Sequence, residues 1–507
     1  MPKLPSVHSG FPPDMPVRTD VLLERARRID LAGQREQAIG LYRRILERDP
    51  LNPQLTTWLG IALAETGKYG QAIIQFDNTL RIDPNQPVAW LNRALAMERV
   101  GRLPDALACY DHIITLRPDE ETGYRGRADV LYGMGRFQEA LAAYDLAMPR
   151  IQNMAEFLAR RGRIPHALGL VDEAMRDFDH AIALQPAHPW ATLTKALLML
   201  LSGDLKGGFA LYEKRHEILE MKQSAPDFAQ PLWLGETSIN GKTLLLYEEQ
   251  GIGDTIQFCR YAPMAARAGA RVVLVVQKPL VELMATLPGV SRIVTEGDPL
   301  PAFDLRCPIM SLPLAFGTTL ETIPGDVPYL RADPERAAVW RDRLSAVRGR
   351  RVGLVWAGGS RPGHTGAVAA DQRRSLPLAA LAPLALLEGC AFVSLQLGPP
   401  AAQAMTPPAG MVLHDHTAKL KNFADTAALI ENLDLVISVD TSVAHLAAAM
   451  GKPVWLLNRF DTCWRWLLNR HDSPWYPTLR QFRQPQPGDW ASVMVRVAEA
   501  LRGFTAR

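Results

Sequence analysis

Two short segments, almost two hundred residues apart, place polar side chains directly after runs of apolar residues. In the first, the apolar run Leu244–Tyr247 leads through Gly251 and Gly253 to Asp254. Consecutive apolar residues are typical of a parallel strand covered on both faces, and the two glycines allow a tight turn into a helix. Asp254 would then lie at the carboxyl end of a strand, where open α/β sheets bind ligands. An ordinary helix cap is the alternative interpretation of this carboxylate.

The second segment is the predicted buried strand Leu433–Val439, which ends at Asp440 and continues with Thr441 and Ser442. A helix is expected to begin here, so its free N–H groups and the two hydroxyls could hold a diphosphate. Either hydroxyl could equally cap the helix, and both roles are compatible. His445 stands one turn inside this helix, a position where a buried core histidine is more common than a ligand contact.

Four more polar residues are candidate ligand contacts because they lie near predicted turns of this kind. Gln257 follows Asp254 on its helix, Ser360 closes a glycine turn after a strand that begins at residue 351, and Gln396 ends another strand. Arg374, beside Arg373 in a Gly-rich stretch that we expect to be flexible, could clamp a phosphate with two hydrogen bonds. An exposed basic pair is an equally good interpretation of these arginines.

An aromatic cluster follows the last predicted strand. It consists of Trp464, Arg465, Trp466, Trp475 and Tyr476. Such rings could stack on a sugar or pack a seam between domains, and seam packing is the better interpretation for most of them.

Alternating strands and helices must position these candidates, and they predict two doubly wound parallel sheets with a cleft between their carboxyl edges. A terminal amphipathic helix over residues 490–501 is expected to cross back over the first sheet. The predicted strands are 243–247, 271–276, 292–294, a short strand within 303–313, one beginning at 351, 391–395, 433–439 and 453–457. The other predicted helices are 254–268, 280–286, one from 423 and 443–450.

The N-terminal half contains a different pattern, a repeat of 34 residues. Small, aromatic and proline residues share the same phase, which predicts pairs of helices in which the small residue permits close approach, the aromatic fills the adjacent space and the proline ends the second helix. The repeating residues are Ala38, Ala72, Ala106, Ala140 and Ala174; Tyr42, Phe76, Tyr110, Tyr144, Phe178 and Tyr212; and Pro50, Pro84, Pro118 and Pro186.

Length and composition limit the function classes. A chain of 507 residues with 48% hydrophobic and 21% charged residues predicts a folded protein of roughly three or four domains. The net charge of +3 gives no indication of nucleic-acid binding. The five cysteines form no C-x-x-C pair, and neither a signal peptide nor a membrane span is evident, so we expect a cytoplasmic location. Ile256 replaces the third glycine of a dinucleotide fingerprint, which disfavours a nicotinamide cofactor.

The repeats resemble the tetratricopeptide repeat over about Val17–Leu219, with a degraded sixth unit in which Gly208 replaces the small alanine. The resemblance implies a solenoid whose concave face holds a protein partner. Residues 249–263 and 440–445 resemble the two signature segments of glycosyltransferase family 9, the heptosyltransferase-like GT-B enzymes. The combination resembles bacterial TPR-glycosyltransferases, some of which glycosylate flagellin, and loosely the repeat-bearing O-GlcNAc transferases.

This resemblance implies that Asp254 is the general base of an inverting transfer and that Asp440, Thr441 and His445 contact the nucleotide-sugar donor. Gly251, Gly253, Gln257, Ser360, Gln396 and Ser442 complete the expected donor site. Two departures stand out: Ser442 replaces the usual glycine, and the phosphate-binding lysine has no match unless Arg374 serves. The resemblance further implies no catalytic metal, and neither predicted sheet contains an Asp-x-Asp motif that would argue otherwise. No cofactor beyond the donor substrate is expected.

The expected organisation is a flexible leader (1–18), TPR repeats (19–222), a linker (223–240), an acceptor-side Rossmann-like lobe (241–345) and a nucleotide-sugar-side lobe (346–507). The expected function is transfer of a sugar to a protein acceptor that the repeats recruit, and the resemblance makes flagellin one candidate acceptor. Two alternatives remain open: an inactive scaffold that only binds, and a transferase acting on lipopolysaccharide or another glycan.

Overall fold

In this computed structural model, residues 19–218, 228–359 and 365–505 are described. They form two compact units. One holds residues 19–133, 145–150 and 365–368, and the other holds residues 134–144, 151–218, 228–359 and 369–505. The expected leader, part of the expected linker and Ser360 lie outside the described residues.

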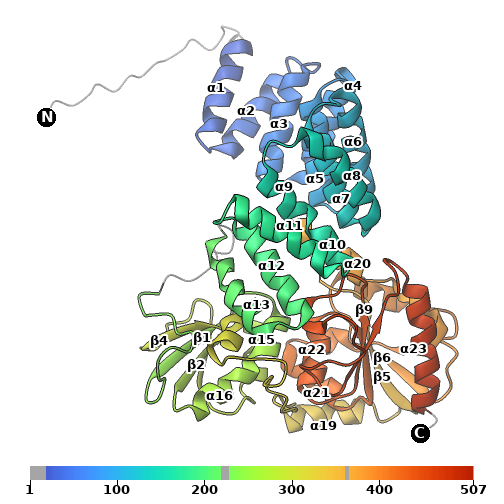
Figure 1. Cartoon of the computed structure of the whole chain (residues 1–507). Helices are drawn as coiled ribbons and strands as arrows, with labels where there is room; N and C mark the ends of the chain where they lie inside the picture. The colour runs from blue at the N-terminus through green and yellow to red at the C-terminus, as the bar shows by residue number, and fades with distance from the viewer. Residues whose placement is uncertain (1–18, 219–227, 360–364, 506–507) are drawn as a thin grey trace, which may run out of the picture. The chain divides into compact units, whose positions relative to one another are not determined.

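The repeat region is helical throughout, as the 34-residue period predicts (Figure 1). Its α-helices are α1 (Thr19–Leu31), α2 (Arg35–Leu46), α3 (Pro53–Glu65), α4 (Tyr69–Ile82), α5 (Pro87–Arg99), α6 (Leu103–Leu116), α7 (Glu121–Gly133), α8 (Phe137–Ala147), α9 (Met154–Arg161), α10 (Arg163–Ala167), α11 (Val171–Leu184), α12 (Pro189–Ser202) and α13 (Leu205–Tyr212).

The repeating small and aromatic residues are core, which confirms their structural interpretation. All five alanines are fully buried, and the six aromatics are at most 5% exposed. Gly60 shows why small residues are needed at such positions. A Cβ placed on Gly60 would lie 2.5 Å from the Phe76 ring of the next helix, so only glycine allows the two helices this approach.

A further repeating class escaped the sequence analysis. Six glycines, spaced 34 residues apart, each lie in the turn between the two helices of one pair. Each has a φ between 73° and 95°. A residue with a Cβ is strained in this left-handed conformation, whereas glycine adopts it at little cost. The residues are Gly33, Gly67, Gly101, Gly135, Gly169 and Gly203.

Two parallel sheets follow the repeats. The first has the strand order β3-β2-β1-β4, and the second the order β10-β9-β8-β5-β6-β7. The first contains β1 (Thr243–Tyr247), β2 (Arg271–Val276), β3 (Val290–Thr295) and β4 (Leu305–Pro308). The second contains β5 (Arg350–Val355), β6 (Cys390–Ser394), β7 (Leu413–His414), β8 (Leu435–Val439), β9 (Val454–Asn458) and β10 (Leu479–Arg483).

The predicted strands are therefore all present, but two edge strands were missed. β10 contains two arginines and a glutamine, so it lacks the continuous apolar run that identified the inner strands. β7 has only two residues. The strand orders also show where successive strands switch from one side of the first strand to the other: β1 lies between β2 and β4, and β5 lies between β8 and β6. In doubly wound sheets such switch points carry the ligand site.

Three predictions about helices need correction. The helix expected over 254–268 is divided into α15 (Ile252–Phe258), a 3₁₀ turn and α16 (Ala262–Arg267), with Pro263 at the start of α16. Arg373 and Arg374 end a helix, α20 (Thr365–Arg374), and do not lie in a loop. The terminal helix α23 (Trp490–Thr505) buries its apolar stripe against the second sheet, beside the edge strand that precedes it, and does not return to the first.

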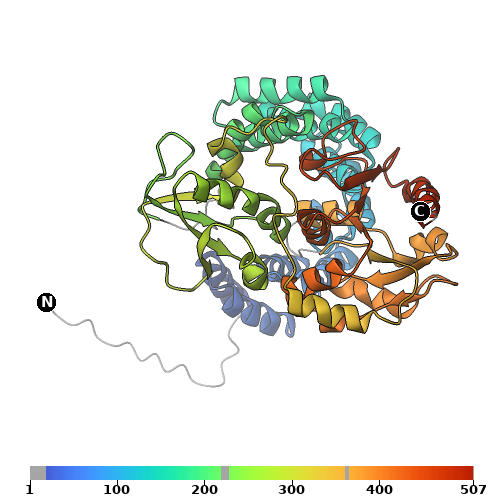
Figure 2. The ribbon, with the colours of Figure 1, turned by 90° about the horizontal axis from the view of Figure 1, so that it is seen from below.

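The last helix pair of the repeats shares a core with both sheets. Leu200 and Phe209, from α12 and α13, belong to the same buried cluster as Leu246 of β1 and Leu456 of β9. Figure 2 shows the first sheet (green to yellow) and the second (orange to red) next to each other within this unit. The described part of the expected linker is likewise packed. The backbone N–H of Trp233 donates to the carbonyl of Arg306 in β4, and the Trp233 side chain belongs to the same buried cluster.

A buried arginine ties the end of the repeats to the turn after β1. Arg215 forms a bidentate pair with Glu249, donating from Nε (3.1 Å) and Nη2 (2.7 Å), and it also donates to Glu213 and Ser311. Its side chain is 1% exposed. Such a pair fixes geometry strongly, because removing one partner leaves a buried charge. The last repeat helices are therefore part of the scaffold that holds the β1 turn.

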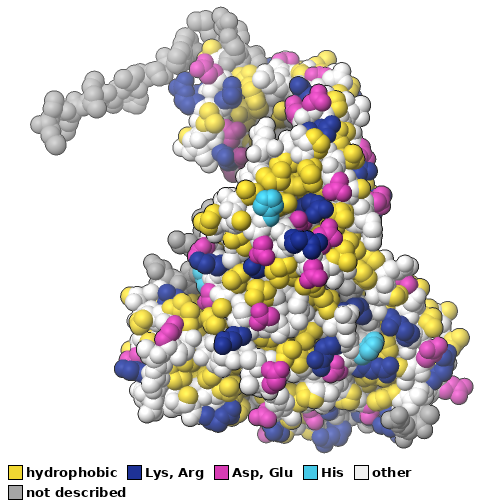
Figure 3. All heavy atoms as spheres, viewed as in Figure 1, with side chains coloured by type: hydrophobic (Ala, Val, Ile, Leu, Met, Phe, Trp, Pro, Cys, Tyr) yellow, Lys and Arg dark blue, Asp and Glu magenta, His cyan; other side chains and the backbone are white. Residues whose placement is uncertain are grey.

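On the face seen in Figure 3, lysine and arginine side chains are interspersed with aspartate and glutamate. Within the described ranges, no helix is long and apolar enough to cross a membrane.

The glycine packing in the repeats is testable with one matched pair of variants. We expect Gly60→Ala to destabilise the protein by about 1–3 kcal/mol, because the added Cβ meets the buried Phe76 ring. Gly40→Ala is the control: this helical glycine of α2 is exposed and has open space around it, so alanine should stabilise by about 0.5–1 kcal/mol. Urea unfolding followed by circular dichroism measures both. Equal effects would contradict the packing argument.

Candidate functional site

The N-termini of two helices, one from each sheet, meet at the candidate site. α15 follows β1, and α22 (Ser442–Ala449) follows β8; the two helices are in contact (Figure 1). A Cβ on Gly253 would lie 3.1 Å from His445 Cδ2 and 3.6 Å from Ser442 Cα. Glycine at 253 therefore permits this close approach. The two segments that the sequence analysis singled out are adjacent in space.

Asp254 is largely buried, and both of its carboxylate oxygens are engaged. Oδ2 accepts the backbone N–H of Gly251 at 2.9 Å, which secures the first turn of α15. Oδ1 accepts from Nη2 of Arg465 in an ion pair. The side chain is 19% exposed. Asp254 is therefore not a solvated N-cap: Gly251 is the N-cap residue, and Asp254, the third residue of the helix, is bonded back to it. The carboxylate has in addition a charged partner from the second sheet's side of the site.

Arg465 is the residue that the sequence analysis missed as a charged member of the site. It stands in a 3₁₀ turn, Trp464–Trp466, in the loop between β9 and β10. Its guanidinium lies 4.4 Å from the Trp464 ring, and its Nε has no hydrogen-bond partner among the described residues. Burial opposes a charged guanidinium, yet the negative charge of Asp254 raises the pKa of Arg465 above its usual value. Arg465 therefore stays charged.

His445 is a buried, neutral histidine. Its Nδ1 lies 2.9 Å from the Tyr476 hydroxyl, and its ring stacks on Trp466 with 5.2 Å between centroids. Burial lowers the pKa of His445 to about 4, and the positive charge of Arg465 contributes to this shift while Asp440 opposes it. Nε2 lies 3.9 Å from Asp440 Oδ1. His445 is thus a buried core residue that also lies beside the N-terminus of α22.

The aromatic cluster packs the seam between the two sheets' helices, as expected. Trp464 and Trp475 both pack on Phe258 of α15, at centroid distances of 6.2 and 5.6 Å. Arg260 strengthens the same seam, because its Nη1 donates to the Trp475 carbonyl at 2.7 Å and its guanidinium lies 4.7 Å from the Tyr476 ring. These contacts hold the candidate site's two halves together.

Arg374 lies against the start of the second segment. Its Nη1 donates to the Asp440 carbonyl at 2.9 Å, while Nε and Nη2 donate to Asp371. Gly358, just after β5, makes room for it: a Cβ there would lie 2.4 Å from Arg374 Nη2. Arg374 is therefore held at the switch point of the second sheet, with its charged guanidinium next to Asp440.

The remaining candidates differ in what their polar atoms do. The Gln396 amide is fully used by backbone: it accepts the N–H groups of Trp356 and Ala357 and donates to the carbonyls of Ala357 and Leu397. It closes the end of β5 and presents no free group. Gln257 is the opposite case, because it is fully buried and neither side-chain polar atom has a partner among the described residues.

Thr441 is the N-cap residue of α22, and its hydroxyl contacts the Ser438 hydroxyl at 3.0 Å instead of capping the helix through its side chain. Ser442 is the first residue of the helix. The first N–H groups of a helix have no intrahelical partner. The structure thus brings Gly251, Gly253, Asp254, Arg374, Asp440, Thr441, Ser442 and His445 around the meeting helix ends. Among the described residues, no group of three or more His, Cys, Asp or Glu is arranged to hold a metal ion.

Comparison with known families matches both parts of the chain. The model described as "Tetratricopeptide repeat" matches residues 32–87 and 91–155. The model described as "Glycosyltransferase family 9 (heptosyltransferase)" matches residues 417–457, which include Asp440–His445. The chain combines tetratricopeptide repeats with a C-terminal glycosyltransferase family 9 domain.

One curated relative is similar over about two thirds of the chain. Protein FlbA of Caulobacter vibrioides is 28% identical over 369 residues, which are 67% of this chain and 60% of FlbA. The chain thus matches about 60% of the length of this curated relative.

Solved structures similar to the chain include the MamA protein (21% identity, 32% of this chain and 90% of that chain, TM-score 0.31). Another is a tetratricopeptide repeat protein from Parabacteroides merdae (20% identity, 39% and 79%, TM-score 0.38). A third is YrrB, described as a TPR protein with an unusual peptide-binding site (18% identity, 36% and 93%, TM-score 0.32).

The neutral state of His445 predicts a specific acid sensitivity. Its folded-state pKa of about 4 lies below the ordinary value of 6.5, so folding favours the neutral ring. Its contribution to stability is complete above about pH 6.5 and is lost as the pH falls toward 4, by at most about 3 kcal/mol.

We expect the stability difference between wild type and His445→Gln to shrink by up to about this amount between pH 7 and pH 4. Urea unfolding at a series of pH values measures the difference. A constant difference over that range would show that His445 titrates normally in the folded protein.

Proposed function

We propose that this protein is a metal-independent, inverting glycosyltransferase of GT-B architecture that moves a sugar from a nucleotide-sugar donor to a protein acceptor recruited by its repeats. One observation carries the proposal: Asp254 and the segment Thr441–His445 lie on helix ends in contact with one another, each following a strand at or beside a switch point. The family 9 match to residues 417–457 supports the activity class.

The chemistry needs a base on one side of the sugar and charge stabilisation on the other. Asp254 would take the proton of the acceptor hydroxyl. The N–H groups at the start of α22 and the hydroxyls of Thr441 and Ser442 would bind the diphosphate, with Arg374 adding positive charge. Gly251, Gly253 and Gln257 would border the donor, and Gln396 would shape the site by fixing the end of β5. Asp440 is proposed to contact the donor sugar or ribose.

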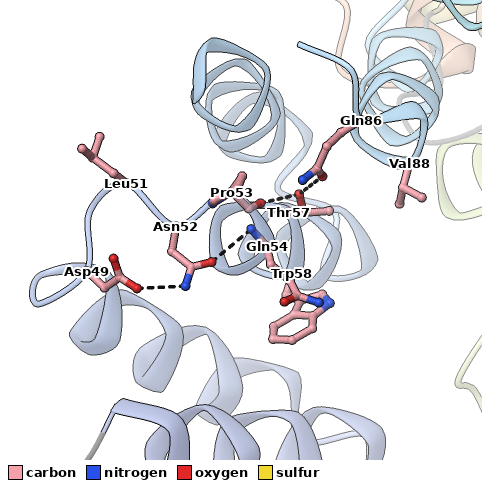
Figure 4. A pocket seen from close by; sticks show the side chains of 9 residues that line it. All are labelled: Asp49, Leu51, Asn52, Pro53, Gln54, Thr57, Trp58, Gln86 and Val88. Atoms are coloured by element: carbon pink, nitrogen blue, oxygen red, sulfur yellow. Dashed lines mark hydrogen bonds between the residues drawn. The ribbon is translucent and has the colours of Figure 1, made fainter. Parts of the chain in front are cut away.

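The repeats offer space for an acceptor. A cavity of about 670 Å³ opens between the starts of α3 and α5 (Figure 4). Thr57, Asn52 and Gln86 supply hydroxyl and amide groups, and Trp58 adds a ring that Arg27 covers at 4.5 Å. Amide and hydroxyl side chains suit the main chain of an extended peptide, and an aromatic ring suits one of its side chains. We propose that this cavity helps to hold the protein acceptor; flagellin is one possible acceptor.

The base role is tested by Asp254→Asn in the full-length protein. We expect the rate of sugar transfer, or of donor hydrolysis without acceptor, to fall by at least about 100-fold, because asparagine takes up no proton. Donor binding should be retained. The control is Glu335→Gln, an exposed carboxylate on α19 (Pro334–Arg343) remote in sequence from the site. A nucleotide sugar that binds the wild type but is never turned over would favour the scaffold alternative.

The acceptor role of the repeats is tested by Trp58→Ala. We expect the acceptor KM to rise about tenfold or more through loss of a buried aromatic contact, with the rate of donor hydrolysis unchanged. Ile74→Ala is the control, since this side chain of α4 is 57% exposed and does not line the cavity. Kinetics with glycan and protein acceptors separate the alternatives: unchanged transfer to a lipopolysaccharide fragment would point to a glycan acceptor. Deleting the whole repeat region is a poor test, because α12 and α13 belong to the shared core.

A further inference from the structure

We propose that the Arg465–Asp254 ion pair is a latch on the active site: a bound diphosphate draws Arg465 away from Asp254 and thereby frees the carboxylate to act as base. The inference rests on the proposed function and extends it, because it assigns a phosphate-binding role to Arg465 and makes the base dependent on the donor.

The first observation is that each carboxylate oxygen of Asp254 already accepts a hydrogen bond in the described structure. One oxygen accepts the Gly251 N–H and the other accepts from Arg465. An acceptor hydroxyl that is to give its proton to one of these oxygens must compete with the donor already bound there. The Gly251 N–H belongs to the backbone of the same helix turn, so the Arg465 side chain is the partner that can move.

The second observation is the state of Arg465 itself. The guanidinium is charged, its side chain is 11% exposed, and its Nε has no partner among the described residues. Asp254 therefore satisfies only part of its hydrogen-bonding capacity. A guanidinium matches phosphate oxygens with two parallel hydrogen bonds, and a diphosphate carries more negative charge than one carboxylate. A diphosphate in reach would compete well for this arginine.

The third observation places Arg465 beside the start of α22. Its neighbour Trp466 stacks on His445, which lies on the first turn of α22. A Cβ on Gly253, one residue before Asp254, would lie 3.1 Å from the same histidine. Arg465 therefore stands next to both helix ends, and the latch requires its side chain to turn from Asp254 toward the start of α22.

The latch gives the reaction an order. Donor binds first, and its diphosphate takes Arg465. The acceptor hydroxyl then hydrogen-bonds to the released Asp254, which takes its proton as the acceptor oxygen bonds to the anomeric carbon. The bond from that carbon to the phosphate oxygen breaks, and the nucleoside diphosphate leaves with the electron pair, its charge balanced by Arg465 and the α22 N-terminus. Without donor, the base stays paired.

A simple structural role for the ion pair makes a different prediction about binding. If Arg465 only clamps the seam, Asp254→Asn can raise diphosphate affinity only by removing a like charge, and that gain should not need Arg465. If the latch holds, Asp254→Asn removes the competitor for Arg465, and diphosphate affinity should rise only while Arg465 is present.

The experiment is calorimetric titration of the full-length protein with UDP, GDP and ADP, and with the monophosphate of whichever nucleoside binds. We expect Asp254→Asn to bind the nucleoside diphosphate about tenfold more tightly than wild type, and Arg465→Met about tenfold or more weakly. Arg465→Lys should recover part of the lost affinity, because lysine keeps the positive charge but cannot make two parallel hydrogen bonds to the phosphates. Affinity for the monophosphate should change less in each case. Arg470→Met, which breaks an exposed pair with Asp472, is the control and should bind like wild type.

The double variant Asp254→Asn/Arg465→Met decides the mechanism. The gain from Asp254→Asn must vanish when Arg465 is absent; a gain that persists would overturn the latch. Unchanged or weakened binding by Asp254→Asn alone would also overturn it, and this result does not depend on how well the Arg465 variants fold. Failure of wild type to bind any nucleoside diphosphate would overturn the proposed function together with the latch, whereas normal wild-type binding with an unresponsive Asp254→Asn variant would overturn the latch alone.

Discussion

The close approach of two helix N-termini is the constraint on which the rest of this unit depends. α15 and α22 each follow an inner strand of a different sheet, and they touch where Gly253 leaves no side chain between them. Two positive helix ends repel each other and attract anions. In the described structure Asp254 supplies the negative charge at this junction, and a donor diphosphate would supply more. The electrostatics of the junction thus favour an anionic ligand before any particular ligand is named.

Buried arginines hold this junction in place from three directions. Arg215 fixes the turn after β1 to the end of the repeats, Arg260 ties α15 to the loop before β10, and Arg465 crosses to Asp254. Burial of a guanidinium is costly unless its hydrogen bonds are satisfied. Arg215 and Arg260 meet that condition with several acceptors, whereas Arg465 leaves Nε unpartnered. The arginine with the fewest fixed partners is also the one beside the proposed reacting atoms.

The involvement of α12 and α13 in the shared core links the repeats to the catalytic candidate. Tyr212, the last of the periodic aromatics, accepts a hydrogen bond from Gln250 in the turn that precedes α15. Its neighbour Phe209 packs edge-on against Trp464, next to Arg465. The degraded sixth repeat is therefore specialised. Gly208 allows α13 to lie against Leu200 of α12. The buried side chains of Phe209 and Tyr212 contact both halves of the site. A partner bound to the repeats within this unit would lie on helices that contact the candidate site directly.

Sequence patterns predicted the parts of the fold that depend on local signals. β1 and β8 are mostly apolar segments, so Asp254 and Asp440 could be placed after them without a structure. The 34-residue alanine and aromatic periods predicted the buried helix faces, and the equally visible glycine period was overlooked. Other features had no local signal. Arg465 lies 211 residues from Asp254 and stands in an aromatic cluster, where packing was the sensible interpretation. Gln396 looked like a ligand contact from its place at a strand end, but only the fold shows that the neighbouring backbone uses its amide.

The most direct test of the account is a crystal structure of the full-length protein with a bound nucleoside diphosphate. The account predicts diphosphate density at the start of α22, within hydrogen-bond distance of the Ser442 N–H, with the Arg465 side chain turned to the phosphates and Asp254 unpaired from it. Nucleotide bound elsewhere on the molecule, with the junction of α15 and α22 unchanged, would contradict it.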